Sequence, residues 1–166
     1  MTRYVALVRG INVGGNSKVP MPVLRSIFEG LGHTEVATLI NSGNVVFTAS
    51  GTPRAEAIEK RIADETGVTT RVLILTSARL KKIAAAMPFT GDESRLIVTV
   101  METVPSGVQV PDDLGEELIH IGSDAVYQWL PQGVSDSKLK PSFWKQFPPE
   151  STGRNIRTVT KLIDLL

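Results

Sequence analysis

The sequence predicts an α+β fold, in which a ferredoxin-like βαββαβ unit at the amino terminus is followed by a second, smaller α+β lobe. Two observations lead to this prediction. Strand and helix signals alternate in the first half of the chain in the order β, α, β, β, α, β, which is the order of a split βαβ unit. After residue 76 the pattern loosens into a strand, a hairpin and short helices. A chain of 166 residues suits one domain or two small lobes, and we expect lobes at residues 1–76 and 77–166.

The first strand and helix are defined by apolar runs of different period. Tyr4–Arg9 is a β-rich apolar run, and a glycine-bearing loop, Gly10–Val19, follows it. Helical spacing then relates Met21, Leu24, Ile27, Phe28 and Leu31. Pro20 and Pro22 suit the first turn of this helix, and Gly32 suits its end.

The remainder of the amino-terminal lobe is a hairpin, a helix and a strand. Short strands at Glu35–Ile40 and Val45–Thr48 flank Asn41–Asn44, whose composition is that of a tight turn. A second helix is expected with Ala55, Ile58 and Ile62 facing inward, before a strand at Thr70–Leu75. In a split βαβ unit the first two strands end at the same sheet edge. We therefore expect the Gly10–Val19 loop and the Asn41–Asn44 turn, about thirty positions apart, to meet in space.

The second lobe is predicted with less regular elements. Ser77 is positioned to cap a helix that carries Leu80, Ile83, Ala84 and Met87. Leu96–Met101 reads as a buried strand, and Glu117–Ile121 with Ala125–Leu130 reads as a hairpin. Pro131–Pro149 is expected to hold a short helix that packs aromatic side chains. No internal repeat is recognisable.

The last segment is predicted as an amphipathic helix. One stripe holds Arg154, Arg157, Thr158 and Lys161, and the opposite stripe holds Ile156, Val159, Ile163 and Leu166. Two arginines then fall in or near the first turn, where unsatisfied N–H groups already make the field positive. An anion would relieve this, so the polar stripe is a candidate site; the alternative is a solvated charged face.

Two polar segments of the amino-terminal lobe are further candidates. The loop that contains Asn12, Gly14, Gly15 and Lys18 lies between a strand and a helix, where N–H groups and a lysine can hold phosphate. Its lysine is displaced from the position that a Walker motif requires, and an ordinary loop with positive-φ glycines is the alternative.

The turn and the end of the first strand add polar groups. Asn41, Ser42 and Asn44 could orient a phosphate or a base edge, or could simply form the turn. Arg9 could grip an oxyanion through two N–H bonds, or could extend from the sheet edge into water.

Composition excludes several classes of function. Eighteen Lys and Arg against seventeen Asp and Glu give a formal net charge of +1, so any basic site must be local. The absence of Cys excludes thiolate chemistry and fits the cytoplasm. No apolar run is long enough to span a membrane, and we expect a soluble protein without a cofactor.

The histidines and the acidic residues of the chain favour structural or solvated roles over catalysis or metal binding. His33 and His120 are scattered and read as structural or exposed. Acidic residues cluster at Asp112, Asp113, Glu116 and Glu117, where the start of a solvated helix is favoured over a cation site. We therefore predict no metal site.

Three motifs in this order resemble those of a known family. Val8–Gly15, Asn41–Phe47 and Gly153–Val159 together resemble the uncharacterised bacterial family catalogued as domain of unknown function 1697, over essentially the whole chain. The resemblance implies a ferredoxin-like unit with a second α+β part, and no established activity. Its third motif usually has Trp where this chain has Ile156, which weakens the idea that an aromatic side chain stacks on a ligand there.

These observations favour a protein that binds a phosphate-bearing ligand, either a nucleotide or a nucleic-acid backbone, in a pocket between the lobes. The expected ligand-binding residues are Arg9, Asn12, Gly14, Gly15, Lys18, Asn41, Ser42, Asn44, Arg154, Asn155, Arg157, Thr158 and Lys161. One alternative is a metal-independent phosphoryl or acyl-phosphate hydrolase. Another is a structural or protein-interaction module in which these side chains brace the lobes. The oligomeric state stays open.

Overall fold

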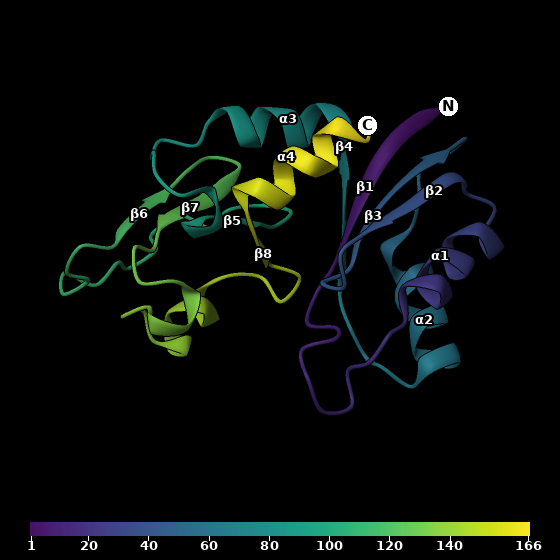
Figure 1. The fold of residues 1–166 in the computed structure, drawn as a ribbon, viewed down its shortest axis with the longest axis horizontal. Helices are drawn as coiled ribbons and strands as arrows, with labels where there is room; N and C mark the ends of the chain where they lie inside the picture. Colours follow the sequence, from purple (N-terminus) through teal and green to yellow (C-terminus); the bar gives the residue numbers. More distant parts are fainter. The chain divides into compact units, whose positions relative to one another are not determined.

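A computed structural model describes all 166 residues of the chain as two compact units. Unit 1 comprises Met1–Leu80 with Leu162–Leu166, and unit 2 comprises Lys81–Lys161. The elements of residues 1–76 are β1 (Thr2–Val8), α1 (Met21–Gly30), β2 (Thr34–Leu39), β3 (Asn44–Ala49), α2 (Ala55–Thr66) and β4 (Val72–Thr76). Figure 1 shows these elements along the chain. The predicted α+β class is confirmed.

The sheet of unit 1 has the strand order β2-β3-β1-β4, with antiparallel neighbours throughout. The hairpin strand β3 therefore lies between β1 and β2, as the order of elements predicts. Because β1 and β2 are both antiparallel to β3, they run in the same direction and end at the same edge of the sheet. This edge carries the loop and the turn that the sequence singled out.

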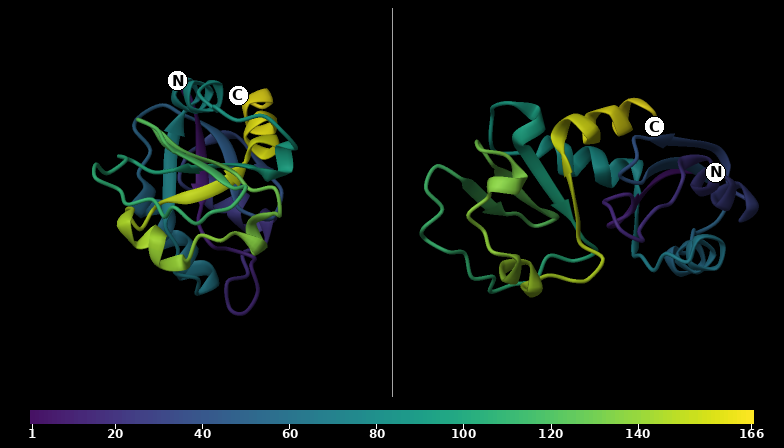
Figure 2. Two further views of the ribbon diagram at one scale, coloured as in Figure 1. Left: turned by 90° about the vertical axis from the view of Figure 1, so that its left-hand side faces the viewer. Right: turned by 60° about the horizontal axis from the view of Figure 1, so that its bottom comes forward.

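Two helices, α1 and α2, lie on the same side of this sheet in Figure 1 and in the right-hand view of Figure 2. The spacing of the apolar side chains on α1 and α2 places one stripe of each helix inward. The buried stripes are Leu24, Ile27 and Phe28 on α1, and Ile58 and Ile62 on α2. They share a core with Ala6, Val8 and Phe47 of the sheet. Burying each large aliphatic or aromatic side chain contributes about 1.5–3 kcal/mol, so this core fixes the sheet edge beneath the loop.

The remaining elements are α3 (Ser77–Ala85), β5 (Leu96–Val100), β6 (Leu118–Ile121), β7 (Ala125–Trp129), β8 (Thr152–Asn155) and α4 (Ile156–Asp164). The second sheet has the order β6-β7-β5-β8, again with antiparallel neighbours. This is the strand permutation of the first sheet, and in both sheets the fourth strand leads directly into a helix. The chain thus contains a topological repeat that the sequence pattern did not reveal, because the connections differ in length and composition.

An aromatic cluster forms part of the core of unit 2. The short helix predicted within Pro131–Pro149 is a 3-10 helix, Pro141–Gln146. Ring centroids of Phe143, Trp144 and Phe147 lie 5.0 to 5.5 Å apart, and Phe143 and Phe147 pack with Met101 and Val126. Since the segment has little regular structure, this aromatic packing is what holds it against the sheet.

The prediction for the carboxy-terminal helix is wrong at its start. Arg154 lies on β8, paired with Val98 of β5, and the helix begins only at Ile156. The reason is a competing local bond: the side-chain Oδ1 of Asn155 accepts a hydrogen bond of 2.9 Å from the backbone N–H of Thr158, which caps the helix there.

The orientation of this helix also differs from the prediction. Val159 and Leu162 are 1% and 0% exposed, whereas Ile156, Ile163 and Leu166 are only partly buried. Thr158, which we placed on the polar stripe, is 7% exposed. Spacing relates these residues in the same way wherever the helix begins, so tertiary packing, which buries the face with Thr158, Val159 and Leu162, decides the orientation. No helix of the protein is long and apolar enough to cross a membrane.

The cap of α4 provides a test of this boundary. Replacing Asn155 with Ala removes the acceptor for the N–H of Thr158 and should lower the free energy of unfolding by about 1 kcal/mol. Urea denaturation of both proteins measures the difference. The control Asn155→Asp retains a capping oxygen and should stay within a few tenths of a kcal/mol of the parent. Equal losses in the two variants would show that the cap is not the cause.

His33 provides a test of the core of unit 1. Its ring lies 4.7 Å from that of Phe47, and burial lowers the pKa of His33 below its ordinary value of 6.5. The unfolded chain therefore takes up a proton before the folded one does, so stability present above about pH 6.5 is lost as the pH falls through the folded pKa. In His33→Phe the free energy of unfolding should fall less between about pH 7.5 and pH 5 than it does in the parent. Urea unfolding of both proteins at the two pH values measures the difference. A parallel decline in both proteins contradicts the prediction.

Candidate anion-binding site

The loop after β1 and the turn between β2 and β3 meet at one sheet edge, as predicted. The backbone N–H of Val8 donates to the carbonyl of Gly43 at 2.8 Å. The side-chain Nδ2 of Asn12 donates to the carbonyl of Asn41, also at 2.8 Å. These bonds join residues about thirty positions apart, so the turn fixes the position of the loop.

Asn12 also closes the loop upon itself. Its Oδ1 accepts a hydrogen bond of 2.8 Å from the N–H of Val19, and its Nδ2 donates to the carbonyl of Val19 at 2.9 Å. Its φ of +58° is tolerated because a short amide side chain suits the left-handed region. The side chain that we expected to contact a ligand therefore braces the loop.

Ser17 adds a second closure that the sequence analysis missed. Its carbonyl accepts from the N–H of Asn12 at 2.8 Å, and its hydroxyl donates to the carbonyl of Gly14 at 2.8 Å. The hydroxyl also lies 3.3 Å from the N–H of Val13, which donates to it. The signal was present in the Gly-Asn-Ser composition, since serine hydroxyls commonly bond to nearby backbone in turns.

The glycines of the loop leave its backbone open. Gly10, Gly14 and Gly15 have φ values of +67°, +101° and +61°, and a β-carbon built on any of them would meet no atom within 4 Å. A ligand atom can therefore approach the main chain at these positions. The role predicted for Gly14 and Gly15, which is to present backbone rather than side chain to a ligand, stays a prediction.

The turn is more tightly packed than the loop. Asn44 is 0% exposed, and its Nδ2 donates to the carbonyl of Leu39 at 3.0 Å and to the hydroxyl of Ser42 at 2.9 Å. Asn44 therefore shapes the turn. Asn41 is exposed and Ser42 half-buried, so these two residues of the turn remain accessible for a ligand.

The charged residues close to the loop in sequence are positive. No Asp or Glu precedes Glu29 in the chain, whereas Arg9 and Lys18 are exposed on either side of the loop. An anion near the loop would thus meet two cations before any carboxylate that lies close in sequence.

The N-terminus of α1, which follows the loop, adds to this field. It has no side-chain cap and no acidic residue in its first turn. The first turn of α2 contains Glu56, and Thr76 and Asn155 cap α3 and α4. Uncapped N–H groups at a helix N-terminus favour an anion.

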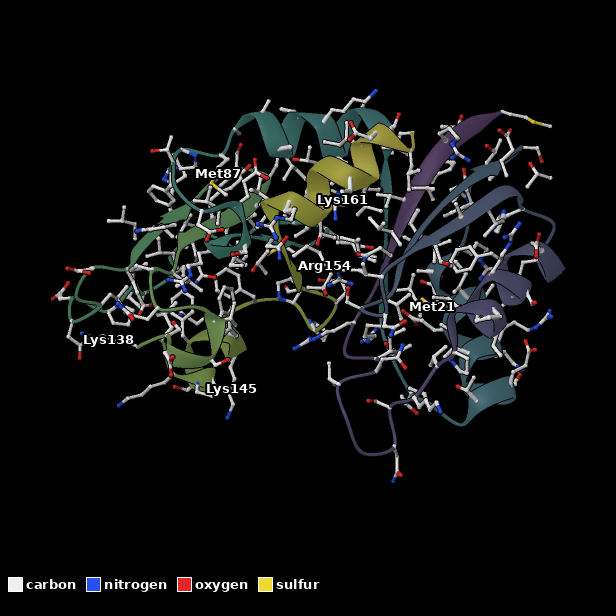
Figure 3. The ribbon with its side chains drawn as sticks, in the orientation of Figure 1. Met21, Met87, Lys138, Lys145, Arg154 and Lys161 are labelled. Atoms are coloured by element: carbon white, nitrogen blue, oxygen red, sulfur yellow. The ribbon has the colours of Figure 1, made fainter.

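Arg154 is the buried cation of unit 2 and extends from β8 (Figure 3). It is 8% exposed, and its Nη1 donates to the hydroxyl of Thr152 at 2.7 Å and to the carbonyl of Gly153 at 2.9 Å. Burial lowers the pKa of Arg154 to about 10, so the guanidinium is still a cation at neutral pH. Part of its hydrogen-bonding capacity serves its own strand.

The other predicted residues near Arg154 differ in exposure. Arg157 is exposed, with its Nη2 3.8 Å from a carboxylate oxygen of Asp92. Hydrogen bonds from the hydroxyl and N–H of Ser94 lower the pKa of Asp92, and the charge of Arg157 adds a smaller effect. Lys161 is exposed on α4 (Figure 3), four residues after Arg157. The ion pair between Arg157 and Asp92 is exposed and 3.8 Å long, so it contributes little to stability.

The acidic cluster of residues 112–117 does not begin a helix, which corrects that prediction. The carboxylate of Glu117 accepts from the hydroxyl of Ser137 at 2.7 Å and from the N–H of Lys138 at 2.6 Å. It thereby fastens the segment that leads to the aromatic cluster. No group of three or more His, Cys, Asp or Glu side chains is arranged to hold a metal ion.

A family model described as "Protein of unknown function (DUF1697)" matches residues 1–127. The chain belongs to this family. The match covers all of the amino-terminal loop and turn and ends before the Arg154 segment. A solved structure of the conserved bacterial protein SP0830 from Streptococcus pneumoniae is similar with a TM-score of 0.71, covering 99% of this chain and 98% of that one. At 24% identity, this similarity shows that the two share a fold. No curated protein sequence matches the chain.

Gly43 tests how closely the turn approaches the loop. A β-carbon there would lie 2.9 Å from Cβ of Val8 and 2.9 Å from Cδ1 of Ile11, at a φ of +88°. Gly43→Ala should therefore lower the free energy of unfolding by roughly 2–4 kcal/mol, as strain and overpacking add.

The matched control is Gly67→Ala, at a φ of +75° with no atom within 4 Å of the added carbon. It carries the backbone strain alone and should cost about 1 kcal/mol. Chemical denaturation of both variants gives the comparison. A difference of less than about 0.5 kcal/mol would show that the close approach is absent.

Proposed function

We propose that this protein binds a phosphate-bearing ligand, a nucleotide or a nucleic-acid backbone, at the loop between β1 and α1. One observation carries the proposal: a loop that is braced by its own side chains, and whose backbone is open at Gly14 and Gly15, leads into a helix N-terminus with neither cap nor acidic neighbour. Phosphate oxygens accept hydrogen bonds from N–H groups in such loops.

The flanking cations support an anionic ligand over a neutral one. Lys18 supplies a compact charge, and Arg9 can form two parallel N–H bonds to one phosphate. Their effect is local, because the whole chain has a formal net charge of only +1. A steering field over the whole surface is not required, and a small ligand is sufficient.

The proposed contacts fall into two groups. Gly14 and Gly15 contact the ligand through backbone, and Arg9, Lys18, Asn41 and Ser42 contact it through side chains. The amides of Asn12 and Asn44 hold the loop and the turn in the shape that these contacts need. Since the bracing bonds form on folding, the ligand does not have to order the loop when it binds.

The residues predicted in the second unit belong to the same proposal. Arg154 is a buried cation, and Arg157 and Lys161 are exposed cations one helical turn apart. Asn155 and Thr158 form the start of α4 between them. We propose that these cations, considered within unit 2 alone, provide a basic surface that also favours a phosphate-bearing ligand.

The test is ligand-induced stabilisation with inorganic phosphate, pyrophosphate, ADP and a short single-stranded oligonucleotide as probes. A ligand present at 100 times its Kd should raise the free energy of unfolding by about 2.7 kcal/mol, visible as a rise in Tm. Lys18→Gln should weaken the affinity by roughly 5- to 30-fold, which corresponds to about 1–2 kcal/mol for one charge-assisted contact. Isothermal titration calorimetry measures this change.

The matched control is Lys145→Gln, which removes an exposed lysine of the aromatic segment (Figure 3) and should leave the affinity unchanged. The proposal fails if no probe shifts the Tm, or if the two lysine variants lose affinity equally. Arg154→Gln separates the second unit's contribution: a loss of affinity together with an unchanged Tm of the free protein supports it. A lowered Tm with parental affinity would assign Arg154 to bracing instead.

A further inference from the structure

A pocket lies within unit 2, and its chemistry differs from that of the loop site. It has a volume of about 430 Å³ and is lined by two segments, residues 104–108 after β5 and residues 121–123 at the turn between β6 and β7. The pocket is open to solvent, since every residue that lines it is half-buried or exposed, and its volume lies within the range of small-molecule sites, about 300 to 1,000 Å³. Neither segment was singled out by the sequence.

The topological repeat explains why a pocket forms at this place. In each unit, the loop that leaves the first strand of the sheet and the turn between the second and third strands arise at one sheet edge. In unit 1 these segments are the glycine loop and the Asn41–Asn44 turn. In unit 2 they are the two segments that line the pocket, so the pocket occupies the equivalent edge.

The first of these segments has no regular structure, yet it is held in place. The side chain of Gln146 accepts from the N–H of Gln109 at 2.8 Å and donates to its carbonyl at 3.1 Å, as a neighbouring strand would. The side chain of Gln109 donates in turn to the carbonyl of Gly107 at 3.3 Å. A long loop fastened by a side-chain amide is ordered before any ligand arrives, which lowers the entropy cost of binding.

The second segment is fixed by the hairpin turn, and an exposed ion pair lies beside it. The N–H of Gly122 donates to the carbonyl of Ala125 at 2.9 Å. Asp124, next to the pocket, lies 3.3 Å from Nζ of Lys82. Both sides of the pocket are therefore preorganised.

The lining has no charged residue. Val104, Val108 and Ile121 pack against the core of unit 2 and form an apolar surface. Ser106 and Ser123 bring hydroxyl groups, and Gly107 has open space where a β-carbon would stand. A flat ring can lie on the apolar side chains while one or two of its polar groups bond to hydroxyl or main chain.

We propose that this pocket binds an uncharged small molecule with a flat apolar body and one or two hydrogen-bonding groups, such as an aromatic amide. A charged ligand is disfavoured because the lining offers no opposite charge to hold it. The site is distinct from the phosphate site proposed above, and its test is independent of that proposal.

The experiment uses the full chain labelled with ¹⁵N and two pairs of probes that differ in charge but hardly in shape: benzamide with benzoate, and nicotinamide with nicotinate. The amides should shift the backbone resonances of Gly107, Gly122 and Ser123, whereas those of Gly14 and Gly15 should stay in place. Each carboxylate should bind at least tenfold more weakly than its amide.

A blocking variant and a matched control complete the test. Ser123→Trp should fill the pocket and weaken amide binding by at least tenfold, while Ser135→Trp, at another exposed serine of unit 2, should bind as the parent does. The inference is overturned if neither amide shifts these resonances. It is equally overturned if the carboxylates bind as well as the amides, or if Ser123→Trp binds with the parental affinity.

Discussion

The side-chain amide of Asn12 is the interaction on which the amino-terminal site depends. One carbonyl oxygen and one NH₂ group join Val19, at the end of the loop, to Asn12 near its start and to Asn41 in the facing turn. A loop of this length would otherwise sample many conformations. The amide of Asn12 makes the hydrogen bonds that a neighbouring strand would otherwise supply to the loop. Gly14 and Gly15 lie between the residues that it joins, so their backbone keeps a defined shape although they have no side chains.

The repeated strand order shows how one sheet arrangement supports two kinds of surface. In unit 1 the connections that cover the sheet are α1 and α2, whose aliphatic stripes form the core. In unit 2 the corresponding connections are a long loop and the aromatic segment with Phe143, Trp144 and Phe147. The segments that cover the two sheets differ, and so do the equivalent sheet edges. The edge in unit 1 is flanked by Arg9 and Lys18, whereas the pocket at the edge in unit 2 has no charged side chain.

The predicted site residues differ in whether their side chains are exposed or form hydrogen bonds that brace the fold. Arg9, Lys18 and Asn41 are exposed, and the amides of Asn12 and Asn44 hold the loop and the turn in shape. Arg154 lies between these cases, since it is buried and bonded to its own strand yet charged at neutral pH. Residue type alone indicated polar chemistry at these positions. The tertiary structure decided which of these side chains form hydrogen bonds within the fold.

The sequence by itself determined the elements whose cause lies within a few residues. The period of Leu24, Ile27 and Phe28 fixed α1, and the composition of Asn41–Asn44 fixed a turn. Tertiary structure decided the remainder, because its causes lie far along the chain. Arg154 is in a strand because Val98 pairs with it, and Gln146 orders a loop whose sequence has no period. Contacts between distant segments leave no local pattern, and these contacts set the strand that holds Arg154, the repeat of strand order and the uncharged pocket.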